Sequence, residues 1–154
     1  MRRPLSVAMA AMIGVLGTVI LSPAFAMERC SMTVRNGSGS SVGSIDSDGT
    51  VRNSSGSGDG RIDENGTVRN SSGSSVGRID DDGTVRNGSG SSIGRVDSDG
   101  TIRNSSGSSV GRIDDNGTVR NGSGGSVGRF DGYSSSCRGV AAAYLFFFNP
   151  LHNQ

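Results

Sequence analysis

The chain repeats a unit of 17 residues six times in succession. The unit reads T-V-R-N-S/G-S-G-S-S-V-G-R-I-D-x-D/N-G, and its copies begin at Thr33, Thr50, Thr67, Thr84, Thr101 and Thr118. A repeat this short cannot bury an apolar face alone, so it needs neighbouring copies to form a shared core. The period therefore predicts a repeat architecture that occupies residues 33–134.

One copy, residues 67–83, predicts two short strands and two tight loops. The β-branched segment 67–70 and the segment 75–80 are typical of strands bounded by turn residues. Between them, S-S-G predicts a three-residue loop with Gly73 in the left-handed region. The Asn70 side chain, at the start of this loop, can bond the backbone two residues on. The D-D-G segment after Asp80 repeats the pattern, so each copy is a hairpin joined to the next by a similar loop.

These loop lengths determine how the strands pair. Val68 is expected opposite Val76, and Ile79 opposite Val85. Val76 and Ile79 are three residues apart, a spacing that puts them on opposite faces of a regular strand. Because glycine is common at bulges, we predict a β-bulge at Gly77, and at its equivalent in every repeat, that returns both side chains to one face.

Apolar residues recur at three positions of the unit without slippage. Composition alone favours a flexible Gly/Ser-rich linker, but a linker has no reason to keep such a register. The predicted fold class is therefore all-β, a radial or closed array of short β-hairpins. The three series are Val34, Val51, Val68, Val85, Ile102, Val119; Ile45, Ile62, Ile79, Val96, Ile113, Phe130; and Val42, Val76, Ile93, Val110, Val127. In the third series, Asp59 is the one residue that is not apolar.

Both ends of the chain differ from the repeats. Residues 1–26 resemble a signal peptide, with a basic Arg2-Arg3 start, an apolar stretch and an Ala24-Phe25-Ala26 cleavage site. Residues 27–32 form a short lead-in, and residues 135–154 an apolar closing segment. Within the latter, the run Val140–Phe148 is too short to span a bilayer as a helix. We expect a buried closing strand there; the alternative is a hydrophobic docking surface for a membrane or a partner.

Two cysteines flank the repeats, Cys30 before the first and Cys137 after the last. An exported chain with an even cysteine count favours a disulfide between them, which would tie the two ends of the array together. Two unpaired thiols are the alternative. The signal peptide and the disulfide together predict a periplasmic or extracellular protein with no transmembrane span in its mature form.

Charge and composition exclude several classes of function. After residue 26 the chain has a formal net charge of −1, and Arg alternates with Asp along each unit. This mixture argues against nucleic acid as a partner and favours cross-strand ion pairs. Catalysis is not expected, because the single histidine, His152, lies near the C-terminus and no nucleophile motif is present. No cofactor is predicted.

The acidic loops raise the question of calcium. D-x-D/N-G partly resembles half of a calcium-binding loop, but it lacks a third acidic position and a distal bidentate glutamate. Asp and Asn before Gly are also what a plain turn requires, and we favour the turn. The candidate ligands are Asp46, Asp48, Asp80, Asp82, Asp97 and Asp99.

The repeated D-G-T-V-R-N-S-S-G-S-S-V-G-R-I-D pattern, the signal peptide and the terminal A-A-x-Y-x-F-F-F run resemble the five-fold β-flower proteins of bacteria. The resemblance implies hairpins arranged radially about an axis and no assigned activity. Six N-x-S-G loops but five D-x-D/N-G loops fit five complete petals plus paired end strands, and five petals or six remain open. Asp59, preceded by Gly58, predicts a local irregularity in the second unit.

The predicted function is an exported, non-enzymatic scaffold or interaction protein of the bacterial cell envelope. Its partner would be an unknown envelope component or a second copy of the chain. The alternative is a calcium- or glycan-binding β-repeat module, in which regularly spaced Ser and Thr columns match a polysaccharide.

Overall fold

The computed structural model describes residues 29–148, so the predicted signal peptide lies outside the described residues. This part of the chain forms twelve short strands followed by a 3₁₀ turn, Ser135–Cys137, and one helix, α1, Arg138–Phe147. The strands are β1 Met32–Asn36, β2 Ser41–Ile45, β3 Thr50–Asn53, β4 Gly58–Ile62, β5 Thr67–Asn70, β6 Ser75–Ile79, β7 Thr84–Asn87, β8 Ser92–Val96, β9 Thr101–Asn104, β10 Ser109–Ile113, β11 Thr118–Asn121 and β12 Ser126–Asp131.

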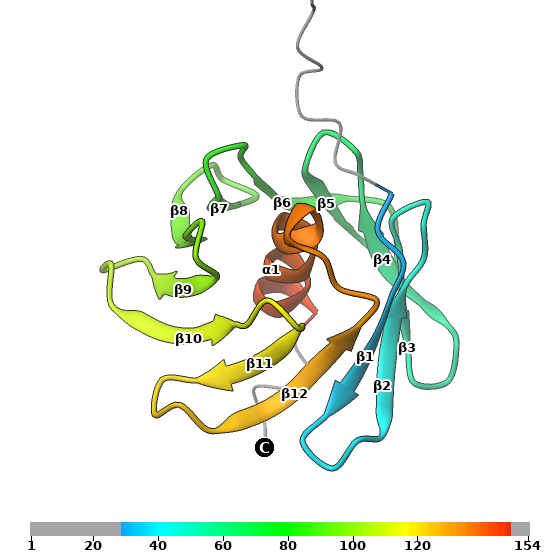
Figure 1. Cartoon of the computed structure of the whole chain (residues 1–154). Helices are drawn as coiled ribbons and strands as arrows, with labels where there is room; N and C mark the ends of the chain where they lie inside the picture. Colours follow the sequence, from blue (N-terminus) through cyan, green and yellow to red (C-terminus); the bar gives the residue numbers. More distant parts are fainter. Residues whose placement is uncertain (1–28, 149–154) are drawn as a thin grey trace, which may run out of the picture.

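The strands form a closed antiparallel barrel around α1 (Figure 1). Each strand pairs with its neighbours in sequence, and the last strand, β12, pairs with the first. Closure leaves no unpaired strand edge on which another chain could add. The predicted all-β closed array of hairpins is confirmed.

The structure contains both kinds of loop in the numbers that the sequence predicts. Within residues 29–148, six N-x-S-G loops each join two strands into a hairpin. Five acidic D-x-D/N-G loops connect these hairpins, and at the sixth position β1 meets β12 without a loop. At this junction Val34 lies opposite Phe130, the register that Val85 and Ile79 have at a connected position. The ring is therefore six hairpins with one non-covalent junction.

The loops follow the predicted chemistry. Gly73 and Gly83 both have φ of +85°, a value that L side chains rarely adopt. In the first loop, Asn70 Oδ1 accepts hydrogen bonds from the backbone N–H groups of Ser72 and Ser74, at 3.1 and 3.0 Å. The asparagine thus satisfies the donors that the tight loop leaves without a strand partner.

A bulge is present in each of the six hairpins described, but the predicted register around it was wrong by one residue. Gly77 lies opposite Val68, and Val76 is the extra residue. Ile79 lies opposite Val85 as predicted. Val76 is consequently half-buried, whereas Val68 and Ile79 are buried inside the ring.

The bulge position also explains why Asp59 is tolerated. Asp59 is the extra residue of the second hairpin, between Gly58 and Gly60, and it is exposed. The Asn53 side-chain amide donates to Asp59 Oδ1 at 3.1 Å. The second hairpin keeps the register of the others, so the irregularity expected there is confined to this side chain.

The closing segment is a helix, and the predicted strand was wrong. The ring pairs its own first and last strands, so a further strand inside it would have no partner for its N–H and C=O groups. A helix satisfies these groups internally and can occupy the axis of the ring. Val140 to Tyr144 are buried there, as expected for a closing element, and the four residues from Leu145 to Phe148 are half-buried.

Large side chains of α1 lie against glycines of the ring. A Cβ on Gly77 would come within 2.7 Å of Phe147 Cε1, and one on Gly60 within the same distance of the Phe148 ring. The same relation joins Tyr144 to Gly43 and Phe146 to Gly94. A Cβ at each of these glycines would also meet a backbone carbonyl of the paired strand, as at Gly111, which has no aromatic ring beside it. In four hairpins the glycine therefore leaves space both for this close strand approach and for one aromatic side chain at the end of the helix.

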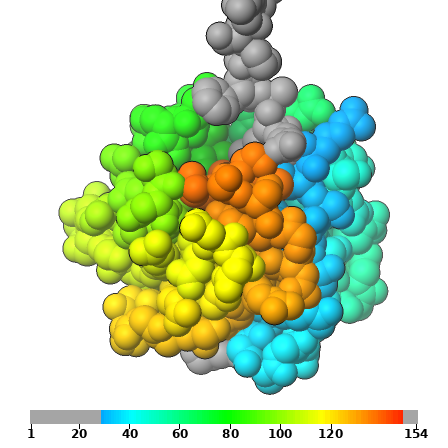
Figure 2. Space-filling model, viewed as in Figure 1, coloured from blue at the N-terminus to red at the C-terminus, as the bar shows by residue number. Residues whose placement is uncertain are grey.

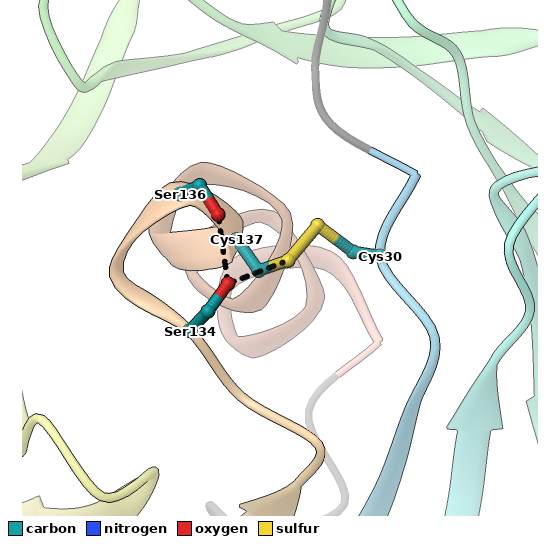
Figure 3. The surroundings of a disulfide bond; sticks show 4 residues. All are labelled: Cys30, Ser134, Ser136 and Cys137. Carbon is teal, nitrogen blue, oxygen red and sulfur yellow. Dashed lines mark hydrogen bonds between the residues drawn. A yellow bond between two sulfur atoms is a disulfide. The ribbon is translucent and has the colours of Figure 1, made fainter.

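A disulfide between Cys30 and Cys137 joins the lead-in of β1 to the start of α1 (Figure 3). The two Cα atoms are 5.7 Å apart, and 107 residues separate them in sequence. Ser134 Oγ donates to Cys137 Sγ at 3.4 Å. The predicted bridge thus ties the two ends of the ring beside its non-covalent junction. Among the described residues, no helix is long and apolar enough to cross a membrane.

Candidate functional site

The outer wall carries a ring of shared ion pairs. Arg78 and Arg86 lie directly opposite each other on β6 and β7, a placement that alone would be repulsive. Asp80 lies between them, with Arg86 Nε at 2.7 Å from Oδ2 and Arg78 on Oδ1. Arg86 Nη1 also donates to the Gly90 carbonyl at 3.1 Å. Asp80 therefore links β6 to β7 and, through Arg86, to the N-x-S-G loop that follows β7.

This arrangement recurs around the ring and confirms the predicted cross-strand pairing. Asp46 pairs with Arg52 alone, because Ser44 replaces the second arginine. Burial raises the pKa of Asp80, but the hydrogen bonds from Arg86 and Arg78 outweigh it and hold the pKa below its usual value. The arginines of the outer wall therefore pair with carboxylates of the protein itself.

The calcium candidates fall into two groups with different partners. Asp46, Asp80 and Asp97 belong to the ion pairs of the outer wall. The others accept a hydrogen bond from a backbone N–H, as Asp82 Oδ1 does from Thr84 at 2.9 Å, and Asp48 and Asp99 do likewise. In residues 29–148 no three His, Cys, Asp or Glu side chains gather as a metal site would need. Calcium binding stays a prediction.

A cavity of about 690 Å³ opens at the acidic-loop end of the ring, beside the start of α1. It is bounded on one side by the loops that follow β4, β6 and β8, and on the other by the segment 135–139 and Arg29. In Figure 2 the orange residues that begin α1 lie next to the green segments of this part of the ring. Ile79 and Val96, both buried, contribute its apolar floor. The volume lies in the range of about 300–1,000 Å³ that is usual for small-molecule sites.

The two sides of this cavity, hereafter the acidic-loop cavity, carry opposite charge. On the loop side, Glu64, Asp81 and Asp82 have no ion-pair partner among residues 29–148. On the helix side are Arg29 and Arg138. Asp80 and Asp97 also line the cavity, but each is neutralised by two arginines of the outer wall. The cavity is therefore bipolar across an apolar floor.

Arg138, the first residue of α1, lines the acidic-loop cavity on its helix side. Its Nε is buried and has no hydrogen-bond partner in the described part of the chain. A buried guanidinium N–H without a partner costs free energy unless an acceptor reaches it. Burial raises the pKa of Tyr133, and the nearby Arg138 guanidinium partly opposes this shift. Arg138 is thus held between Tyr133 and the cavity.

The opposite end of α1 has a different polar feature. Burial, with a smaller contribution from the Asp59 charge, raises the pKa of Tyr144 to about 12. The phenol is therefore neutral at all physiological pH values. Its ring packs edge-on against Phe130, with centroids 5.8 Å apart. Tyr144 is a packing residue of the core.

Sequence reasoning did not find the acidic-loop cavity. The cavity depends on the axial position of α1, which a strand in its place would not have produced. One signal was available: the second position of the acidic loops varies between Ser, Glu and Asp, while the neighbouring positions hardly change. Glu64 and Asp81 occupy that position in two of the three loops that border the cavity, and Ser98 occupies it in the third.

The fold and the comparison with protein families agree. A family model described as "5-fold beta-flower protein" matches residues 31–149, which include the whole ring and α1. No curated protein and no solved structure matches the chain. The radial hairpins that the resemblance implied are those of the structure, although six N-x-S-G hairpins close the ring here. The chain belongs to the 5-fold beta-flower protein family.

Proposed function

We propose that this chain is an exported, non-catalytic scaffold or interaction protein of the bacterial cell envelope. The observation that carries the proposal is the closed ring whose ends are joined by the Cys30–Cys137 disulfide. A disulfide persists in oxidising compartments and is rare in the cytosol. The signal-like residues 1–26 support the same compartment.

The surface of the ring suits a rigid interaction scaffold. The arginines and aspartates of its outer wall are paired with each other, and the loops at both ends are braced by hydrogen bonds. No free edge is available for strand addition, so a partner would bind through the loops or the acidic-loop cavity. An unidentified envelope component or a second copy of the chain would be such a partner.

The non-catalytic part of the proposal rests on the available side chains. The described residues contain no histidine, lysine or free cysteine, and His152 lies outside them. The beta-flower fold is not a known enzyme class. Histidine is the commonest general acid or base in enzymes, and it also activates many serine and cysteine nucleophiles.

The test combines localisation with cross-linking in the living cell. A photo-reactive residue replaces exposed Ser72 on an N-x-S-G loop or exposed Asp81 on an acidic loop; one at Arg78, on the outer wall, is the matched control. We expect the chain in the envelope fraction with residues 1–26 removed, and a defined adduct from at least one loop position. A chain retained in the cytosol, or adducts equally frequent from Arg78, would contradict the proposal.

A further inference from the structure

The acidic-loop cavity combines three properties that bear on what it could bind. It is large enough for a small organic ligand, its floor is apolar, and its two sides carry opposite charge. We infer that it binds a small zwitterion with an apolar middle, of the class of a free amino acid or a peptide of two or three residues.

The loop side would hold the ammonium end of the ligand. Glu64 and Asp81 are neighbours around the ring, because they occupy the same position in successive loops. Neither takes part in the ion pairs of the outer wall, which in these two loops involve Asp63 and Asp80. Asp82 adds a third negative charge, although its Oδ1 already accepts the Thr84 N–H. Carboxylates beside a partly desolvated cavity favour a cation over a neutral group.

The helix side would hold the carboxylate end. Arg29 and Arg138 line this side. A guanidinium presents donors in a planar fork that suits a carboxylate. The charges of Arg29 and Arg138 would attract a ligand carboxylate to this side of the cavity.

The apolar floor sets the character of the ligand between its charged ends. Ile79 and Val96 belong to the buried series of two successive hairpins. Glycines at 66, 83 and 139 also line the cavity and leave room above this floor. An aliphatic side chain placed here would remove apolar surface from water on both partners. Simple ions or wholly polar sugars would not use this surface.

The experiment is solution NMR of the secreted, disulfide-intact chain with labelled Ile and Val methyl groups. The probes are leucine, Ala-Leu and Ala-Ala-Leu at millimolar concentration. We expect at least one of them to shift the methyl resonances of Ile79 and Val96 and to leave Ile113, which lies outside the cavity, unchanged. For the probe that binds, we expect the N-acetylated and C-amidated forms to bind on the order of tenfold more weakly, since each lacks one charge.

Charge-neutralised variants assign the two ends. Glu64→Gln combined with Asp81→Asn is expected to lower the affinity for the zwitterion about tenfold and to leave the affinity for its N-acetylated form unchanged. Asp115→Asn, at the equivalent position of a loop away from the cavity, is the matched control and is expected to change neither. Arg138→Gln tests the other end; if it unfolds the chain, Arg29→Gln tests the same end alone.

Three results would overturn the inference. The first is the absence of any methyl shift at Ile79 and Val96 with all three zwitterions. The second is equal affinity for the charged and the capped probes, which would make the cavity a purely apolar site. The third is a loss of affinity in Asp115→Asn as large as that in the variant that combines Glu64→Gln with Asp81→Asn. Each of these leaves export and cross-linking unaffected, so failure here is distinguishable from failure of the scaffold proposal.

Discussion

At the scale of single residues, the glycines of the repeat meet two different physical needs. Gly73 has a positive φ and open space around the position of a Cβ, so its cost on substitution is conformational. Gly77 carries no such backbone constraint but faces the Arg86 carbonyl and the Phe147 ring. Sequence patterns recognise the first kind through its loop. The second kind depends on a helix some 70 residues away along the chain. The local pattern could therefore explain Gly77 only by a bulge, and the structure has that bulge at Val76.

Two alanine substitutions separate these needs. Gly77→Ala is expected to lower the free energy of unfolding by about 1–3 kcal/mol, because the added methyl group would overlap both the Arg86 carbonyl and the Phe147 ring. Gly58→Ala is the control, since its Cβ would have nothing within 4 Å and no positive φ opposes it. It should be neutral or slightly stabilising. Urea unfolding measures both, and equal losses would contradict the role assigned to Gly77.

The aspartates of the acidic loops predict a dependence of stability on pH. The hydrogen bond from the following threonine N–H holds the pKa of Asp48, Asp82 and Asp99 below its usual value. Because the folded-state pKa is depressed, the stabilisation is complete above the unfolded value of about 3.9 and is lost as pH falls through the folded value.

The chain supplies its own control for this effect. Asn65 and Asn116 accept the same threonine N–H bond in the other two loops without titrating. Replacing Asp48, Asp82 and Asp99 together by Asn should therefore keep the bonds and make the fall of melting temperature between pH 5 and pH 2 shallower. Parallel curves for the variant and the parent chain would contradict this explanation.

At the scale of elements, the hairpins were predictable because their determinants are local. Asn70, Gly73 and the β-branched T-V segment lie within a few residues of each other, and they specify the loop and both strands. Helix α1 was not predictable in this way. Its run of V-A-A-A-Y-L-F-F-F is apolar throughout and therefore shows no periodicity that distinguishes a helix from a strand. The helix is favoured because the closed ring offers no strand partner to a segment inside it.

The fit of α1 in the ring can be tested at Ala142, which is completely buried. Ala142→Leu is expected to destabilise the protein by about 1–3 kcal/mol, because the neighbouring strands leave no room for the larger side chain. Val110→Leu enlarges an apolar residue that is 45% exposed, so it should be close to neutral. Denaturant unfolding compares the two. A tolerated Ala142→Leu would indicate that the helix is not tightly enclosed.

At the scale of the whole molecule, the disulfide and the β1–β12 pairing both close the ring. Replacing Cys30 and Cys137 together by Ala is expected to cost about 2–4 kcal/mol of unfolding free energy, chiefly through the freedom regained by the unfolded chain. The far-ultraviolet circular dichroism spectrum should be unchanged, since strand pairing persists. A chain that loses its β spectrum at room temperature on this change would show that the non-covalent junction cannot hold alone.

The most direct test of the closed ring is backbone amide hydrogen exchange at the β1–β12 junction. This pairing joins the two ends of the repeat array, and no loop enforces it. If the ring is closed, amides of β1 and β12 should be as strongly protected as those of β5 and β6, which lie in the middle of the array. Rapid exchange along β1 and β12, with protection kept in β5 and β6, would instead show an open sheet with two free edges.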